Sequence, residues 1–134
     1  MFCREHIAQL REHEDAFREK GASLAAIGLG DMRYAQIFRR ESGITFPLLI
    51  DEQRRAYRAA GLRNGSLLHL LRQDNAIARK RAQSAGHRQR GLGKNPFQLG
   101  GSFVFGPGNV DLYVHISQTF GDNALPGVLL DAIP

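Results

Sequence analysis

The sequence has one cysteine, no tryptophan and no long hydrophobic run. A single cysteine, Cys3, excludes an intramolecular disulfide and with it the disulfide-stapled scaffolds of small secreted domains. No stretch approaches the ~18 to 20 uninterrupted apolar residues that a spanning helix needs, and the N-terminus has no apolar signal-peptide core. The sequence therefore predicts a cytoplasmic protein without a membrane span.

Length and composition are those of one globular domain. The chain has 134 residues, of which 43% are hydrophobic and 23% are charged. A chain of this size buries roughly two thirds of its unfolded surface, usually around one core. We therefore expect a single domain over residues 1–134, and the composition excludes a disordered or collagen-like chain.

Acidic residues are scarce in one part of the chain. The net charge is +5, but residues 53–100 carry eleven Lys and Arg residues and a single acid, Asp74. The leucines at 67–71 give this part an apolar side, so residues 63–97 are predicted to form a basic helical insertion. It has few aromatic residues for base stacking and no nucleic-acid motif, so nucleic acid is not expected as a partner.

The rest of the sequence predicts helices and strands in alternation. Apolar residues at helical spacing predict helices, and short apolar runs next to glycine predict buried strands. A Gly-Pro-Gly-Asn turn between two β-rich runs predicts a hairpin. The expected helices are 4–20, 32–41, 51–60 and a last one capped by Asp122 or Asn123, and the expected strands are 23–29, 46–50, 102–105 and 110–116.

This order of elements is that of a thioredoxin-like α/β fold. Two crossovers build the parallel half of a mixed sheet, and the hairpin builds its antiparallel edge. We expect three layers, α/β/α, with the basic insertion placed before the C-terminal hairpin. The strand that should lead into the first helix is missing from this pattern.

Cys3 lies at the predicted start of the first helix, where unpaired N–H groups and the helix dipole favour an anion. Arg4 follows directly, and His6 lies one turn further on. These features favour the thiolate, which is the form that attacks a peroxide or a disulfide. The alternative interpretation is that Cys3 is a small buried hydrophobic residue.

Three stretches carry a resemblance to a known family: FCRE at 2–5, FPLLIDEQRRAYRAAGL at 46–62 and LGGSFVF at 99–105. In this order and spacing the chain resembles the bacterial peroxiredoxin-like proteins of the alkyl hydroperoxide reductase and thiol-specific antioxidant (AhpC/TSA) superfamily. The resemblance runs through nearly the whole chain. It implies a thioredoxin-like fold and thiol-based redox chemistry.

In that family the helix usually opens with Cys-x-x-Cys-Arg, and Cys3 with Arg4 matches the second half of this motif. The first cysteine would fall before Met1, so the resemblance implies an N-terminally truncated member. Two explanations stay open, a start codon internal to a longer protein and a degenerate paralogue.

The resemblance implies a thiol oxidoreductase in which Cys3 and Arg4 are the catalytic residues and a peroxide or disulfide is the substrate. Because the chain has no second cysteine, an external thiol such as thioredoxin or glutathione would resolve the product. His6, Gly101 and Ser102 are supporting candidates. No cofactor is expected, and no metal, because Cys3-x-x-His6 is half of a metal site at most.

A second hypothesis belongs to a different class of protein. It holds that the domain is a catalytically inactive binding or regulatory module that uses the basic face at 54–94. A Cys3→Ser substitution separates the two hypotheses, because only the first requires the thiol. Self-association as a homo-oligomer is a further expectation, since a missing strand exposes the interior of the sheet.

Overall fold

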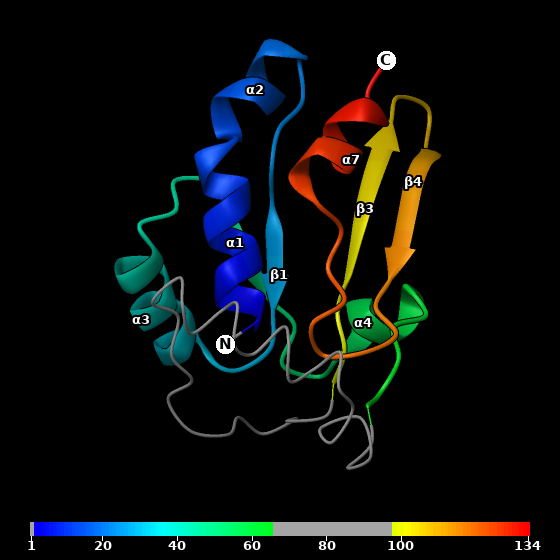
Figure 1. Cartoon of the computed structure of the whole chain (residues 1–134). Coiled ribbons are helices and arrows are strands. Elements are labelled where there is room, and N and C mark those ends of the chain that lie inside the picture. The colour runs from blue at the N-terminus through cyan, green and yellow to red at the C-terminus, as the bar shows by residue number, and fades with distance from the viewer. Residues whose placement is uncertain (1, 66–97) are drawn as a thin grey trace.

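The computed structural model describes residues 2–65 and 98–134, except for the side chains of Phe2 and Cys3, so that nearly all of the predicted insertion at 63–97 lies outside it. Helices and short strands alternate up to the gap, and a hairpin and a last helix follow it (Figure 1). No helix in the described ranges is long and apolar enough to cross a membrane. The elements are α1 (Phe2–Glu12), α2 (Glu14–Glu19), β1 (Ala26–Gly28), α3 (Met32–Ser42), β2 (Leu48–Ile50), α4 (Arg55–Ala59), β3 (Gly101–Gly106), β4 (Val110–Ile116) and α7 (Pro126–Asp131).

The strands form two separate pairs. β1 and β2 are parallel, whereas β3 and β4 form an antiparallel hairpin with a bulge between Val104 and Phe105. Within the described residues no hydrogen-bonded ladder joins the two pairs, and Figure 1 shows β1 and β3 apart from each other and running in opposite directions. This combination of parallel and antiparallel pairs confirms the predicted mixed α/β fold.

The edge of β1 that faces away from β2 is capped by a side chain. Ala26 N–H donates to Pro47 O, and Asp51 N–H donates to Gly28 O, so these residues direct their backbone groups toward β2. Because successive residues of a strand alternate, the groups of Ile27 face the other edge. There the Tyr57 hydroxyl of α4 donates to Ile27 O at 3.0 Å, and no described strand does.

The first predicted helix, 4–20, is two helices in the structure. The ring nitrogen Nδ1 of His13 lies 2.8 Å from Gln9 O, which is the carbonyl that a regular helix would pair with His13 N–H. That N–H donates to Leu10 O instead. The side chain therefore competes for a helical hydrogen bond, and α1 ends before His13.

Aspartate carboxylates lie at the starts of two helices, although α4 begins at Arg55, later than the predicted helix 51–60, and Arg54 is its N-cap residue. The Asp31 carboxylate accepts from Tyr34 N–H at 2.8 Å and caps α3, and Asp51 accepts from Arg55 N–H at 2.8 Å at the start of α4. The predicted cap of the last helix at Asp122 or Asn123 is wrong. α7 begins at Pro126, whose fixed φ suits the first helical position, without a side-chain cap.

Two groups of buried side chains form the core. Phe17, Ala124 and Leu129 join α2 to the C-terminal part of the chain. A second group, formed by Phe38, Ile44 and Phe46, joins α3 to the start of β2. The side chain of Leu24 packs against both groups, so one continuous apolar region lies between the helices and the strand pairs.

Replacement of Phe17 by alanine tests this core. Phe17 is 3% exposed, and Phe→Ala at such sites lowers the free energy of unfolding by about 3 to 5 kcal/mol, because burial is lost and a cavity remains. Urea denaturation followed by circular dichroism measures the change. Phe105→Ala is the matched control, since Phe105 is 70% exposed and its loss should leave the urea midpoint nearly unchanged.

Candidate active site

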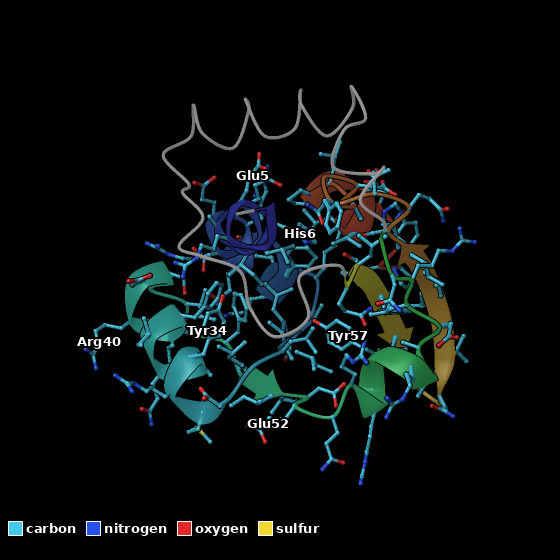
Figure 2. All side chains as sticks on the ribbon, turned by 90° about the horizontal axis from the view of Figure 1, so that it is seen from below. Glu5, His6, Tyr34, Arg40, Glu52 and Tyr57 are labelled. Atoms are coloured by element: carbon cyan, nitrogen blue, oxygen red, sulfur yellow. The ribbon has the colours of Figure 1, made fainter. Side chains whose placement is uncertain are left out.

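The first turn of α1 carries the only cysteine. α1 spans 11 residues and begins at Phe2, so the backbone of Cys3 lies in the first turn, as the sequence predicts. N–H groups of a first turn have no partner within the helix, and the positive end of the helix dipole lies there. Both effects favour negative charge near the start of a helix. Figure 2 views the molecule from this end of α1.

The guanidinium of Arg4 is directed to α3. Its Nη1 donates to Glu41 Oε2 at 2.7 Å, and its Cζ lies 5.1 Å from the centre of the Phe38 ring. Both charged side chains of the pair are largely shielded, with 20% and 27% of their surface exposed. Arg4 therefore fixes the first turn of α1 against α3, and its charge is balanced by a carboxylate.

His6 lies on the side of α1 that faces α7 (Figure 2). Burial lowers the pKa of its imidazole below the ordinary value of 6.5, and the nearby charge of His115 acts in the same direction. A hydrogen bond to the backbone of Ala124 and the charge of Glu5 oppose this shift. The ring is therefore neutral at pH 7, and its buried Nε2 has no hydrogen-bond partner among the residues that the structure describes.

His115 of β4 and residues of the loop that follows β4 form a polar network near His6. His115 Nε2 is 3.1 Å from Asp122 Oδ1, and Asp122 Oδ2 accepts from Gln118 N–H at 2.8 Å. The backbone carbonyl of Asp122 also accepts the hydroxyl of Ser117. These contacts hold the Asp122 carboxylate beside the His115 ring, so it can balance a positive charge on that ring.

The sequence interpretation missed this network. The sequence pattern predicts that Asp122 caps a helix, and it does not distinguish His115 from the other four histidines of the chain. One signal pointed to His115: it is two residues from Tyr113 in a strand, and Tyr113 packs against the core, so both side chains lie on the same face of β4.

The other two predicted site residues lie on β3. Gly101 pairs with Ile116, and Ser102 pairs with His115, in the β3–β4 ladder. A Cβ atom on Gly101 would lie 2.7 Å from His115 O and 2.7 Å from Leu62 Cδ2. The close packing therefore requires a glycine at position 101. Ser102 lies opposite His115, whose charge acts on His6.

The described residues contain no group of three or more His, Cys, Asp and Glu side chains that could hold a metal ion. Most of the basic face at 54–94 lies outside the described residues. Of its described members, Arg54 donates to Gln98 and Arg63 donates to Gln118. These two arginines contact neutral side chains of the domain itself.

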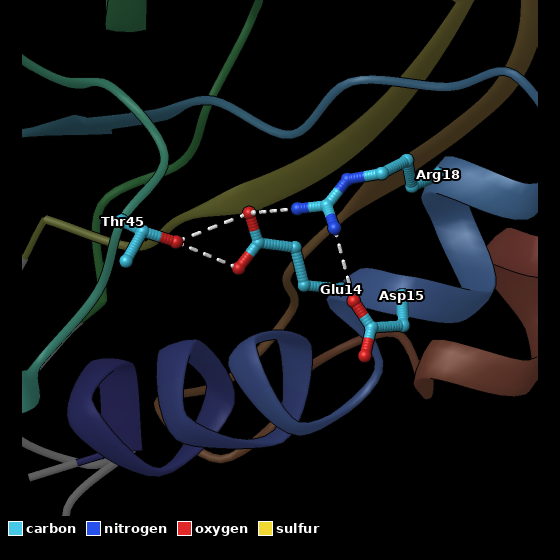
Figure 3. A network of polar contacts seen from close by, with 4 residues as sticks. All are labelled: Glu14, Asp15, Arg18 and Thr45. Atoms are coloured by element: carbon cyan, nitrogen blue, oxygen red, sulfur yellow. Dashed lines mark hydrogen bonds and ion pairs between the residues drawn. The ribbon is translucent and has the colours of Figure 1, made fainter.

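A second polar cluster lies beside α2 (Figure 3). Thr45 Oγ1 donates to the Glu14 carboxylate at 2.9 Å, and Arg18 pairs with Asp15 at 3.1 Å and more weakly with Glu14 at 3.5 Å. A pocket of about 270 Å³ lies next to these side chains, with Phe46 among its lining residues. The Glu14 carboxylate is satisfied by Thr45 and Arg18, so the cluster joins α2 to the segment before β2.

His6 makes the stability of the fold dependent on pH. Because its pKa in the fold is lowered, the unfolded chain takes up a proton below pH 6.5 that the folded chain does not. The free energy of unfolding should therefore fall as the pH drops below 6.5, by up to about 1.4 kcal/mol per pH unit, with no contribution well above that pH.

Urea denaturation at about pH 7.5, 6.5 and 5.5 measures this dependence. His6→Gln should flatten it, while His13→Gln, at an exposed position of the adjoining turn, should not. Equal pH dependence in the His6→Gln variant and the wild type would contradict the assignment.

No curated protein and no solved structure matches the chain. A protein-family scan matches residues 9–119 to the AhpC/TSA antioxidant enzymes, a range that begins after Cys3, Arg4 and His6. It covers most of the chain and agrees with the thioredoxin-like arrangement of helices and mixed strand pairs. The chain belongs to the AhpC/TSA antioxidant enzyme family.

Proposed function

We propose that this protein is a peroxiredoxin-like thiol oxidoreductase in which the Cys3 thiolate reduces a peroxide or a disulfide. The observation that carries the proposal is the position of the only cysteine, in the first turn of an 11-residue helix, within a chain of an antioxidant enzyme family. A thiolate is the nucleophile of this chemistry, and a helix N-terminus stabilises it.

With a peroxide, the sulfur of Cys3 attacks one peroxide oxygen, and the O–O bond breaks. The sulfur is oxidised to sulfenic acid, and the other oxygen leaves as water or an alcohol after it takes up a proton. One external thiol then forms a mixed disulfide with Cys3 and releases water. A second external thiol displaces Cys3 as the reduced thiol and is itself released as a disulfide.

Thioredoxin or glutathione of the cytoplasm supplies the external thiols in this scheme, since the sequence holds no second cysteine. Arg4 contributes by fixing the first turn of α1 through Glu41 and Phe38. A rigid first turn keeps the backbone N–H groups directed at the position where negative charge is stabilised.

Cys3→Ser should abolish thiol-dependent peroxide consumption, because a serine hydroxyl stays protonated at pH 7 and cannot replace the thiolate as the nucleophile. The measurement follows hydrogen peroxide and an alkyl hydroperoxide with glutathione, and separately with thioredoxin and its reductase. Arg33→Ala, at an exposed position of α3, is the control variant and should keep the wild-type rate. Equal rates for Cys3→Ser and the wild type would refute the proposal.

A further inference from the structure

We propose that the outer face of the β3–β4 hairpin is a docking site for an acidic, amphipathic helix of a partner protein. The outer face is the side of the hairpin that points away from α7. It is formed by five apolar side chains, Phe103 and Phe105 of β3 and Val110, Leu112 and Val114 of β4. The proposal does not depend on the chemistry of Cys3 and adds an interaction surface to the proposed function.

The two faces of the hairpin differ in their contacts. Val104 and Tyr113 pair in the ladder and pack against the buried group that includes Leu129 of α7. Because successive residues of a strand point to opposite faces, Leu112 and Val114 point away from this group. Figure 2 shows α7 on one side of the hairpin and α4 on the other, so α7 does not cover the outer face.

The outer face is apolar and open to solvent. The side chains of Val110, Leu112 and Val114 are 50%, 38% and 47% exposed. On β3 the rings of Phe103 and Phe105 stack with their centres 5.9 Å apart, and Phe105 is 70% exposed. Single exposed apolar residues are common, but a group of them on one face marks an interaction surface.

A helix matches the size and the surroundings of the outer face. β3 spans six residues, which is about 20 Å of strand and equals the length of about 13 helical residues. At one end of the face, a Cβ atom on Gly101 would lie 2.7 Å from Cδ2 of Leu62, the residue that follows Gly61 after α4, and 3.3 Å from the Phe103 ring. Apolar sheet faces are buried under helices in α/β folds, so a helix beside α4 would complete this layer.

The charge next to the outer face is positive. α4 has the sequence RAYRA, and its Arg55 and Arg58 are exposed. Neither arginine forms an ion pair with an acidic side chain that the structure describes, and the nearby Asp51 carboxylate is occupied by N–H groups of α4. Acidic side chains of a partner would therefore find two unpaired cations at this end of the face.

The same features disfavour two other occupants. A second copy of this chain would bring the same apolar side chains without acidic ones, and Arg55 and Arg58 would stay unpaired. A bilayer would meet α4 on this side of the hairpin, and its arginines would stay among the lipid headgroups and keep the flat face away from the hydrocarbon. A helix is narrow enough to lie beside α4.

A synthetic peptide tests the proposal with the full chain. The probe is a fluorescein-labelled helical peptide of about 18 residues, with leucines at positions i, i+3, i+4 and i+7 and mainly glutamates elsewhere. One control peptide has the same composition with the leucines moved out of the stripe. The other has lysine in place of each glutamate. Fluorescence anisotropy measures the dissociation constant of each peptide.

The acidic amphipathic peptide should bind, and both control peptides should bind at least about tenfold more weakly, because each loses one half of the recognition. Phe105→Ser should weaken binding of the acidic peptide roughly tenfold, since an aromatic contact is lost. Met32→Ser is the matched control: Met32 is 64% exposed on α3, and its replacement should leave the affinity unchanged.

Charge reversal tests the electrostatic part. The double variant Arg55→Glu, Arg58→Glu should weaken binding of the acidic peptide and remove most of its dependence on salt. The double variant Arg33→Glu, Arg40→Glu makes the same change in net charge at exposed positions of α3 and should bind as the wild type does. All four positions are exposed, so circular dichroism should show the same fold in both variants.

Three results would overturn the proposal. The first is no binding of the acidic peptide to the wild type at about 1 mM, or equal affinity of Phe105→Ser and the wild type. The second is sedimentation of the wild type, but not of Phe105→Ser, with vesicles of phosphatidylcholine and phosphatidylserine, which would assign the face to a membrane. The third is a dimer in size-exclusion chromatography that Phe105→Ser abolishes, which would assign it to a second copy.

Discussion

The packing of the first two helices against the segment that follows β4 is the contact on which the rest of the structure depends. Phe17 of α2 meets Ala124 and Leu129, and Leu10 of α1 packs against the same group. Hydrophobic burial of this kind is the main favourable term in folding. Here it also decides which polar groups come together, because the loop that brings Ala124 to the core places Asp122 beside His115.

Much of the fold could be predicted from the sequence, because local rules govern it. The cap at Asp31, the helix end at Gly43 with its positive φ, and the hairpin around Gly108 and Asn109 all follow from residue types that favour those backbone conformations. The order of the expected helices and strands indicates the thioredoxin-like arrangement, the family resemblance implies the same fold, and the family match supports it.

The parts that could not be predicted depend on contacts between distant residues. The first helix ends before His13 because the ring of His13 competes for Gln9 O. The spacing of apolar residues along the sequence does not reveal this competition. Asp122 resembles a helix cap in sequence, but the hydrogen bonds of Gln118 and Ser117 direct it to β4. Arg4 likewise precedes no acid at helical spacing, and its partner Glu41 lies on another helix.

The junction between the two strand pairs has a mechanical consequence. Within the described residues β1 and β3 share no backbone ladder, and the free edge of β1 receives a single hydroxyl from Tyr57. A hydrogen-bonded ladder resists sliding because several bonds must break together, whereas apolar side chains can shift past one another with little directional resistance. Among the described residues, apolar side chains and the Tyr57 hydrogen bond join the hairpin to the β1–β2 pair. A force that pulls these two parts away from each other therefore meets no row of backbone hydrogen bonds between the described strands.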